Sequence, residues 1–426
     1  MTDPVGVGVI GAGYWGRKLI GEYLASERNT GNVRLFKICD ASLAALLECK
    51  RKFSIEDDRL SRDFKDVIEN PKISAVHIAT PNPTHYPLAK MALEAGKDVL
   101  VEKPMTLKSS EAYELVDLAD SQKRVLRVGH IFRYNAALRS ARQLLRRGSL
   151  GKIFYVRVQW TDSVYFPDRD IIFDLGPHPI DVLNQLLDAW PEQVSALSKV
   201  YRDSKHHEVA YVIAEFQNDV FAQIELSWLH PTKTREAIVI GSEETLIVDC
   251  LRQHLTRVHN GNIVDISVPV NNTIESEITS FVTSVARRSV SRESGLLGAR
   301  TVEVLEAIRE SMRERPVPLP RRFGDDHTSA LVAVLETVSN GVNGRVTEIQ
   351  RDGDRDTRRY LELLVKQGLV RGAVTKEGLT YEVTETGSQF LKECRDIARG
   401  LEWTFGRSHP RGSEARANVS SSGTQS

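Results

Sequence analysis

Three side chains in two short motifs have the residue types needed to move a proton during the oxidation of an alcohol. Lys103 lies in VEKPM, and Asp174 and His178 lie in FDLGPHPIDVL. When a nicotinamide oxidises an alcohol, a hydride leaves the carbon and a proton leaves the hydroxyl group. A base with a pKa of about 7 is then needed, and histidine supplies one. A carboxylate can orient and stabilise the imidazole, and a lysine can stabilise negative charge on the reacting oxygen.

The spacing of the second motif indicates how its side chains are held. Asp174 and His178 are four residues apart, which places two side chains on the same side of a helix. Pro177 and Pro179 suit a first helical turn, with Asp174 just before it. The alternative for His178 is a buried structural histidine.

A glycine-rich turn near residue 11 predicts a dinucleotide site. In GVIGAGYWG, Gly11, Gly13 and Gly16 form GxGxxG after an apolar strand and before a helix. Gly11 permits a tight turn, Gly13 lets the backbone approach a pyrophosphate, and Gly16 lets the helix pack on the strand. Free N–H groups and the helix dipole then favour the phosphates.

Asp40 predicts which dinucleotide binds. It ends the second expected strand, 24 residues after Gly16, where a carboxylate accepts the ribose hydroxyls of NAD and repels the extra phosphate of NADP. NAD is therefore favoured over NADP. The alternative is that Asp40 caps the helix that follows.

The elements around these motifs predict three structural units. The first is an α/β Rossmann domain, residues 1–125, with a parallel sheet covered on both faces. Its strands are expected at 5–10, 33–39, 75–80, 98–102 and 125–129, and its helices near 14–26, 41–53, 63–69, 85–95 and 108–121.

A second, α+β domain is expected over residues 126–320. Alternating apolar and polar residues predict a large open, mostly antiparallel sheet with one covered face. Its strands are expected at 153–160, 194–201, 208–216, 220–228, 236–242, 245–250 and 263–269, and its helices at 177–187, 274–290 and 294–313.

A C-terminal winged helix domain is expected over residues 327–407, after a proline-rich linker at 321–326 and before a disordered tail at 408–426. Helices at 330–338, 347–353 and 355–370, a hairpin around a KEG turn and a final helix give this pattern. Arginines at 355, 358 and 359 suit a DNA reader, but aspartates at 352, 354 and 356 are interleaved with them. Binding to DNA and docking to protein both remain open.

Composition limits the remaining classes. The 426 residues carry no net formal charge, so no overall field attracts nucleic acid or a membrane. The four cysteines lack metal-ligand spacing and fit a reducing cytoplasm. No apolar segment is long enough for a membrane span. We therefore expect a cytoplasmic protein without a metal site.

The chain resembles the Gfo/Idh/MocA oxidoreductase family. The motifs that carry the resemblance cover residues 1 to about 320 in the family's order: GVIGAGYWG, ATPNPTHYPLA, VEKPM, VGHIFRYN, LGKI and FDLGPHPIDVL. It departs from many members at Asp170, where glycines are usual before the aspartate, and at Ala136, where proline is usual. The family implies the Rossmann and open-sheet domains, and self-association through the open sheet.

The resemblance also implies the site. Lys103, Asp174 and His178 are the expected catalytic residues, and Pro104 the expected cis-proline. The expected cofactor contacts are Gly11, Gly13, Tyr14, Trp15, Gly16, Asp40, Thr80, Pro81, Asn82, His85, Glu102 and Lys103.

One of these motifs and one further stretch indicate the substrate class. VGHIFRYN and SWLHPTKTR resemble those of members that act on nucleotide-linked amino sugars, such as UDP-N-acetylglucosamine 3-dehydrogenases. Besides Lys103, Asp174 and His178, the expected substrate contacts are Arg133, Lys233 and Arg235 on a diphosphate and Tyr134, Trp160, Tyr165 and Trp228 stacked on sugar or base. The alternatives are surface charges and aromatic residues of the sheet.

Two functions are weighed. The first is an NAD-dependent dehydrogenase for a hydroxyl group of a sugar, polyol or sugar nucleotide. The second is a transcriptional regulator that senses NAD or a sugar and acts through the winged helix. The presence of Lys103, Asp174 and His178 favours the first, because a sensor needs no proton acceptor.

Overall fold

The computed structural model describes residues 3–164, 166, 169–202, 206–312, 334–335, 338–339, 355–375 and 378–393. The chain divides into two compact units, residues 1–315 and 316–426, and each is described by itself.

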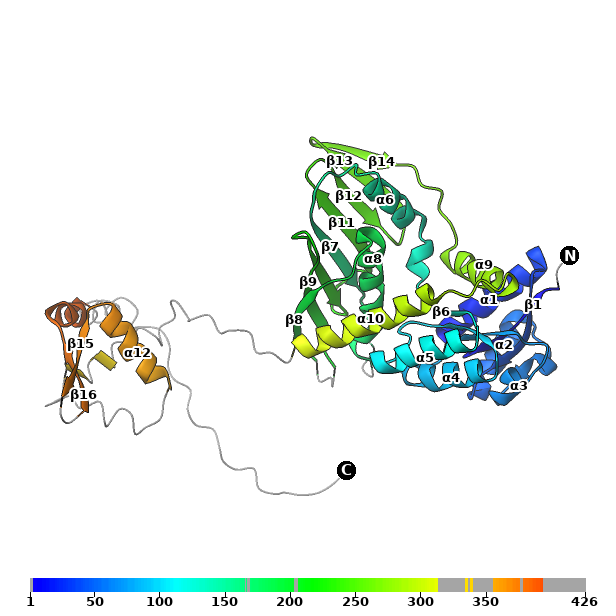
Figure 1. Cartoon of the computed structure of the whole chain (residues 1–426), viewed down its shortest axis with the longest axis horizontal. Helices are drawn as coiled ribbons and strands as arrows, with labels where there is room; N and C mark the ends of the chain where they lie inside the picture. The colour runs from blue at the N-terminus through cyan, green and yellow to red at the C-terminus, as the bar shows by residue number, and fades with distance from the viewer. Residues whose placement is uncertain are drawn as a thin grey trace, which may run out of the picture. The chain divides into compact units, whose positions relative to one another are not determined.

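The first unit begins with a parallel sheet of six strands within the described residues, in the order β3-β2-β1-β4-β5-β6 (Figure 1). This is the doubly wound order of dinucleotide-binding folds and confirms the predicted Rossmann-like sheet. The strands are β1 (Val5–Ile10), β2 (Val33–Cys39), β3 (Leu60–Ser61), β4 (Ala75–Ile78), β5 (Asp98–Val101) and β6 (Leu126–Val128). The helices are α1 (Tyr14–Thr30), α2 (Leu43–Phe53), α3 (Lys65–Ile68), α4 (His85–Glu94) and α5 (Ser109–Ser121).

The three central strands have the burial that the sequence predicted. Every residue of β1, β4 and β5 is buried, as expected for strands covered on both faces. The strand β3 was not predicted, because its two residues are too few for a periodic pattern. The last strand, β6, lies just after residue 125, where the sequence analysis ended the first domain.

The second sheet has eight strands in the described part of the chain, ordered β14-β13-β12-β11-β7-β10-β9-β8. Its neighbours are antiparallel except for β7 and β10, which are parallel, so the mostly antiparallel sheet is confirmed. The strands are β7 (Ile153–Thr161), β8 (Gln193–Lys199), β9 (Val209–Glu215), β10 (Phe221–Ser227), β11 (Thr234–Gly241), β12 (Thr245–Asp249), β13 (His254–His259) and β14 (Asn262–Ile266).

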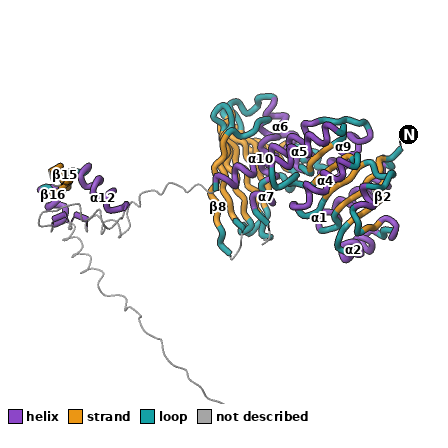
Figure 2. The backbone as a smooth tube through the Cα atoms, turned by 60° about the horizontal axis from the view of Figure 1, so that its bottom comes forward, coloured by secondary structure: helices purple, strands orange, loops and turns teal. Residues whose placement is uncertain are grey.

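Helices cover one face of this sheet, as Figure 2 shows for α6 and α10. They are α6 (Ala136–Arg146), α7 (Ile171–Leu175), α8 (Pro177–Leu187) and α10 (Arg292–Ser311). The other face is open, and on it Tyr155 stacks against Phe221 with ring centroids 5.4 Å apart, both side chains remaining exposed.

Besides β3 and the short helix α7, two further elements were not predicted from the sequence. The helix α6 buries only Ala137, Leu138 and Ala141 and carries several arginines on its other side. Its start carried a signal, because Asn135 caps it by accepting the N–H of Leu138 at 3.1 Å. The strand β13 is HLTRVH and buries one large apolar residue, Leu255.

The helix α9 (Thr273–Ala286) packs differently from the prediction. Residues 274–290 were expected to close the second domain. Ile278, Phe281 and Val282 instead join the core formed by β1 and α1 of the Rossmann domain, and α9 lies beside α1 in Figure 1. The helical pattern gave the helix correctly, but the pattern cannot say which core the helix joins.

The second unit contains α12 (Arg355–Lys366), the antiparallel hairpin β15 (Val370–Thr375) and β16 (Gly378–Val383), and helical residues 385–393. Leu361, Leu364, Val370 and Leu391 share a small core. The expected helix at 347–353, the linker at 321–326 and the tail at 408–426 lie outside the described residues. No helix in the described parts of the chain is long and apolar enough to cross a membrane.

An ion pair fastens the end of α9 to the Rossmann sheet. Arg288 Nη1 lies 2.7 Å from Oδ2 of the fully buried Asp98. Burial raises the pKa of Asp98, and Arg288 opposes this effect. We predict that Arg288→Gln lowers the free energy of unfolding by about 1–2 kcal/mol at pH 8, less than for a wholly buried pair because Arg288 is half exposed.

The pH dependence of this loss tests its cause. Because the folded-state pKa of Asp98 is raised, the penalty for its buried charge disappears as pH falls through that pKa. Urea unfolding across pH should therefore show a smaller loss in acid. The exposed Arg287→Gln is the matched control, and an equal loss in both variants would contradict the role of the pair.

Candidate active site

The turn between β1 and α1 requires two of its three glycines for reasons internal to the protein. Gly11 has φ of 105°, and a Cβ there would lie 2.3 Å from the carbonyl oxygen of Ala79. A Cβ on Gly16 would lie 2.0 Å from the carbonyl oxygen of Gly11. Gly11 therefore serves the turn and Gly16 the packing of helix on strand.

Gly13 fits a dinucleotide instead. Its φ of −67° is open to any residue, and a Cβ there would meet no heavy atom within 4 Å. Gly13 is also the N-cap of α1 and provides no side-chain cap, so the first N–H groups of the helix face the space beside it. The remaining reason for glycine is the approach of a phosphate to these N–H groups. The turn therefore fits the pyrophosphate of NAD.

Asp40 lies against this turn. Its Oδ2 accepts the N–H of Ala12 at 2.7 Å, and its Oδ1 accepts the N–H of Ser42 at 2.8 Å. The cap of α2 is Ser42, which accepts the N–H of Ala45, so the alternative role of Asp40 as a helix cap does not apply. The carboxylate follows β2 directly and lies beside the glycine turn, and each oxygen keeps a lone pair for a ribose hydroxyl.

The loops that follow β4 and β5 are joined by His85, the first residue of α4. Its Nδ1 lies 2.8 Å from the carbonyl oxygen of Pro104, and its Nε2 lies 2.8 Å from that of Thr80. The Lys103–Pro104 peptide bond is cis, as the family resemblance implies. His85 is buried and so holds the two loops together. Pro81 and Asn82 are the next residues of the first loop, Asn82 opening a short 3-10 turn.

Three further expected cofactor contacts, Glu102, Trp15 and Tyr14, differ in exposure and in charged neighbours. Glu102 is buried, with Oε1 3.5 Å from Nε2 of His77. Burial raises the pKa of Glu102, but His77, Trp15 and Lys103 outweigh it and leave the pKa lowered. Tyr14 is exposed, and its pKa is lowered chiefly by Lys18 and to a smaller extent by Lys233 of the second domain.

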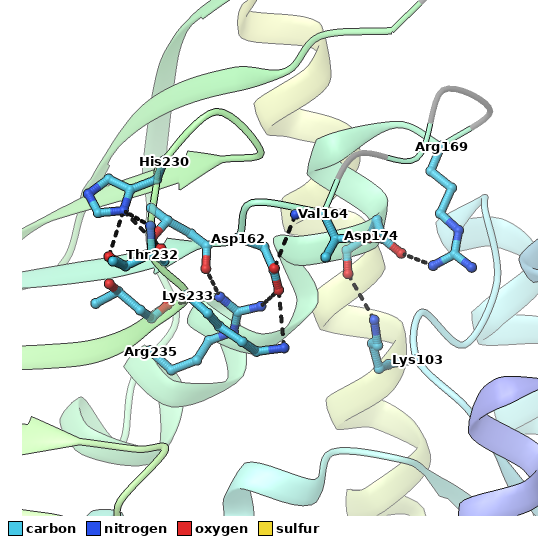
Figure 3. A network of polar contacts seen from close by, with 11 residues as sticks. Lys103, Asp162, Val164, Arg169, Asp174, His230, Thr232, Lys233 and Arg235 are labelled. Carbon is cyan, nitrogen blue, oxygen red and sulfur yellow. Dashed lines mark hydrogen bonds and ion pairs between the residues drawn. The ribbon is translucent and has the colours of Figure 1, made fainter.

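Lys103 connects the two domains. Its Nζ donates a hydrogen bond to the backbone oxygen of Asp174 at 2.8 Å (Figure 3). Burial lowers the pKa of Lys103, while Asp174 and Glu102 partly counteract that effect. A buried ammonium group with a lowered pKa gives up a proton more readily than an exposed one.

Asp174 is held from both sides. It lies in α7, which Asp170 caps by accepting the N–H of Ile172 at 2.8 Å. Its carboxylate accepts a hydrogen bond from Nη1 of Arg169 at 2.9 Å (Figure 3). Sequence reasoning missed Arg169, because no motif marks an arginine five residues before the aspartate. Its position next to Asp170, the cap of α7, places it beside Asp174.

His178 lies in the first turn of α8, as its neighbouring prolines predict. Its ring makes edge contacts with Phe132 at 5.0 Å between centroids and lies 5.8 Å from Trp160. Burial, Lys103 and Arg235 lower the pKa of His178 well below its ordinary value, so the imidazole is neutral at pH 7. Among the described residues, the Asp174 carboxylate accepts its hydrogen bond from Arg169. The ring of His178 is oriented by the aromatic rings of Phe132 and Trp160.

A second group of charges stands next to His178. Arg235 is buried, its guanidinium lies 5.3 Å from the centre of the Trp160 ring, and it donates to Asp162 at 3.1 Å. The Nζ of Lys233 lies 3.1 Å from the same Asp162 oxygen and remains half exposed (Figure 3). Burial raises the pKa of Asp162, but Lys233 and Arg235 lower it overall.

The other expected substrate contacts lie elsewhere or are buried. Arg133 bonds Oδ1 of Asp181 at 2.6 Å and Asn184 at 2.5 Å. The hydroxyl of Tyr134 accepts from Arg127 at 3.3 Å. Trp160 and Trp228 are buried, which fits aromatic residues of the sheet. Tyr165 lies outside the described residues. In the described part of the chain, no group of three or more His, Cys, Asp or Glu could hold a metal ion.

Comparisons with known proteins match this architecture. A model of the oxidoreductase family with an NAD-binding Rossmann fold, named for Gfo, Idh and MocA, matches residues 5–130, and the model of that family's C-terminal domain matches residues 138–247.

Among relatives, an uncharacterized oxidoreductase of Escherichia coli is 35% identical over 192 residues, which cover 42% of this chain and 53% of the relative. The chain thus spans about half the length of that relative. UDP-N-acetylglucosamine 3-dehydrogenase of Acidithiobacillus ferrooxidans is 28% identical over 315 residues, covering 71% of this chain and 95% of the relative.

Solved structures show the same fold. The structure of the Acidithiobacillus ferrooxidans enzyme matches with a TM-score of 0.63 and 24% identity, over 72% of this chain and 99% of that chain. An inositol dehydrogenase homolog of Azotobacter vinelandii, complexed with NADH and myo-inositol, matches with a TM-score of 0.65 and 19% identity, over 73% and 96% of the two chains.

The glycine turn gives a paired prediction. Gly13→Ala should weaken NAD binding by about tenfold or more, because the added methyl group occupies the phosphate approach, while the free energy of unfolding changes by less than about 0.5 kcal/mol. Gly16→Ala should instead destabilise the fold by about 1–3 kcal/mol through its clash with Gly11. Fluorescence titration with NADH and thermal unfolding measure the two effects. Wild-type NADH affinity in Gly13→Ala would refute the assignment.

Proposed function

Because the chain belongs to the Gfo/Idh/MocA family of NAD-binding oxidoreductases, we propose that it oxidises a secondary hydroxyl group of a sugar, polyol or sugar nucleotide by hydride transfer to NAD. The observation that carries this proposal is the group formed by Lys103, Asp174 and His178. Lys103 stands at the carboxyl end of β5, where doubly wound sheets bind their ligands, and its ammonium group is fixed on Asp174 at 2.8 Å.

NAD, when bound, supplies the acceptor for the hydride that leaves the substrate carbon. The neutral imidazole of His178 accepts the hydroxyl proton, which a protonated ring does not do. Lys103 donates to the same oxygen and stabilises the negative charge that develops on it. Asp174 is a positioning residue in this geometry, since its carbonyl oxygen holds Lys103 and its carboxylate holds Arg169.

A nucleotide sugar is the substrate class with the most support. The relative aligned over 95% of its own length is named a UDP-N-acetylglucosamine 3-dehydrogenase. All three expected diphosphate contacts are paired with a carboxylate: Lys233 and Arg235 with Asp162, and Arg133 with Asp181. Of the three side chains, Lys233 is the most exposed. Lys233 is therefore the residue we assign to a phosphate, with Arg169 as a second exposed cation at Asp174.

The open face of the second sheet supports self-association. Tyr155 and Phe221 stack there while exposed, and Tyr211, Ile213 and Leu197 are exposed on the neighbouring strands. Contiguous apolar surface of this kind is characteristic of protein interfaces, so we assign the face to a homo-oligomer.

The second unit is assigned to a winged helix. Its support is the order of α12, the β15–β16 hairpin and the helical residues 385–393, together with their shared core. The function as a transcriptional regulator has no observation in its favour among the described residues, so the unit is proposed as an accessory for assembly or regulation.

The test of the dehydrogenase is turnover with a panel of nucleotide sugars, aldoses and polyols, read as NADH absorbance. With the substrate so identified, His178→Ala should lower kcat by about 10²–10⁴-fold, the usual contribution of a general base, and leave NADH affinity within about twofold of wild type. His254→Ala, a half-exposed histidine of β13, is the control. Full turnover in His178→Ala would refute this mechanism.

The pH dependence gives an independent test. Because burial, and to a smaller extent the surrounding cations, lower the pKa of His178, the ring stays unprotonated into mild acid. We expect kcat/KM to rise with pH along a limb whose midpoint lies below about 6.5, the ordinary histidine value. The limb should be absent from His178→Gln. A midpoint at or above the ordinary value would contradict the neutral buried base.

A further inference from the structure

A cavity of about 380 Å³ lies along α6, and none of Lys103, Asp174 and His178 lines it. It is lined by four arginines, two glutamines and a tyrosine: Arg133, Arg139, Arg142, Arg146, Gln143, Gln185 and Tyr134. Arg139, Arg142 and Arg146 follow one another at intervals of three and four residues, so they share one face of the helix. Like charges at this spacing repel each other, and their gathering in one cavity calls for a negative partner.

Carboxylates of the protein balance only part of this positive charge. Asp188 accepts from Nη2 of Arg142 and from Nη2 of Arg146, each at 2.7 Å, and Asp181 accepts from Arg133 at 2.6 Å. Arg139 is exposed and has no ion pair within the described residues. Four guanidinium groups thus face two carboxylates, which leaves an excess of two positive charges around the cavity.

The wall of the cavity also offers buried polar atoms without a partner. Gln185 is only 2% exposed, and its amide oxygen has no hydrogen-bond partner among the described residues. Its amide nitrogen reaches the carbonyl oxygen of Arg133 at 3.5 Å. The Nε of Arg142 is buried and likewise unpartnered within that part of the chain. Buried polar atoms are normally satisfied, so a polar molecule in the cavity is expected to bind them.

We propose that this cavity binds a small phosphate-bearing molecule, with its phosphate on the α6 arginines and a hydroxyl or amide group on Gln185. Guanidinium groups match phosphate oxygens with paired hydrogen bonds, and the excess of two charges matches a phosphate monoester or a diphosphate. The volume exceeds what one phosphate needs and falls in the range of small-molecule sites. The proposal concerns binding alone and does not depend on the proposed dehydrogenase function.

Calorimetric titration of the full chain with pyrophosphate tests the proposal. Saturating NAD is present throughout, so that the glycine turn of the Rossmann domain is already filled. We expect one site per chain, weakened by added salt. Arg139→Gln should reduce the affinity by about tenfold or more, as expected for the loss of a charge-assisted hydrogen bond. Glutamine keeps the helix propensity of arginine, and Arg146→Gln provides a second variant on the same face.

Arg147→Gln is the matched control, because Arg147 is exposed at the end of the same helix and does not line the cavity. Its affinity for pyrophosphate should stay within about twofold of wild type. Equal weakening in Arg147→Gln, or unchanged affinity in Arg139→Gln and Arg146→Gln, would overturn the proposal. So would the absence of binding at about 10 mM pyrophosphate. Loss of binding in Lys233→Gln alone would place the anion at the candidate active site instead and would also overturn it.

Discussion

The hydrogen bond from Nζ of Lys103 to the backbone oxygen of Asp174 is the contact on which the site geometry depends. It joins the carboxyl edge of the Rossmann sheet to α7 of the second domain across 71 residues of sequence. The acceptor is a carbonyl oxygen, which does not titrate, so the contact is independent of the protonation of the Asp174 side chain. That side chain is consequently available to Arg169. The peptide group fixes the lysine, while the carboxylate balances the charge of the half-exposed Arg169.

The electrostatics of the site follow from placing several cations near one imidazole. Burial is the main cause of the lowered pKa of His178, and Lys103, Arg235 and Lys233 add to its effect. Buried cations need compensation, and Asp162 provides it by pairing with both Arg235 and Lys233. Asp162 therefore allows a cationic environment in which the histidine stays neutral.

The sequence predicted the parts of this arrangement that rest on local rules. The glycine spacing, the buried parallel strands and the prolines of α8 each have a local physical cause, and each prediction matches the described elements. It did not predict contacts that depend on distant packing. Arg133 and Arg235 were expected at a diphosphate because their charge was visible, whereas their pairing with Asp181 and Asp162 was not. In the same way, the amphipathic pattern of α9 revealed a helix but not its core.

The helix α8 is held by VGHIFRYN, a motif remote from it in the sequence. His178, Asp181 and Gln185 are spaced three and four residues apart, so they share one face of α8. The short segment η3 (Ile131–Tyr134) lies along that face: Phe132 contacts His178, and Arg133 contacts both Asp181 and Gln185. Movement of η3 would therefore shift the ring of His178 and the ion pair of Asp181 together. VGHIFRYN thus fixes α8, and with it the imidazole of His178.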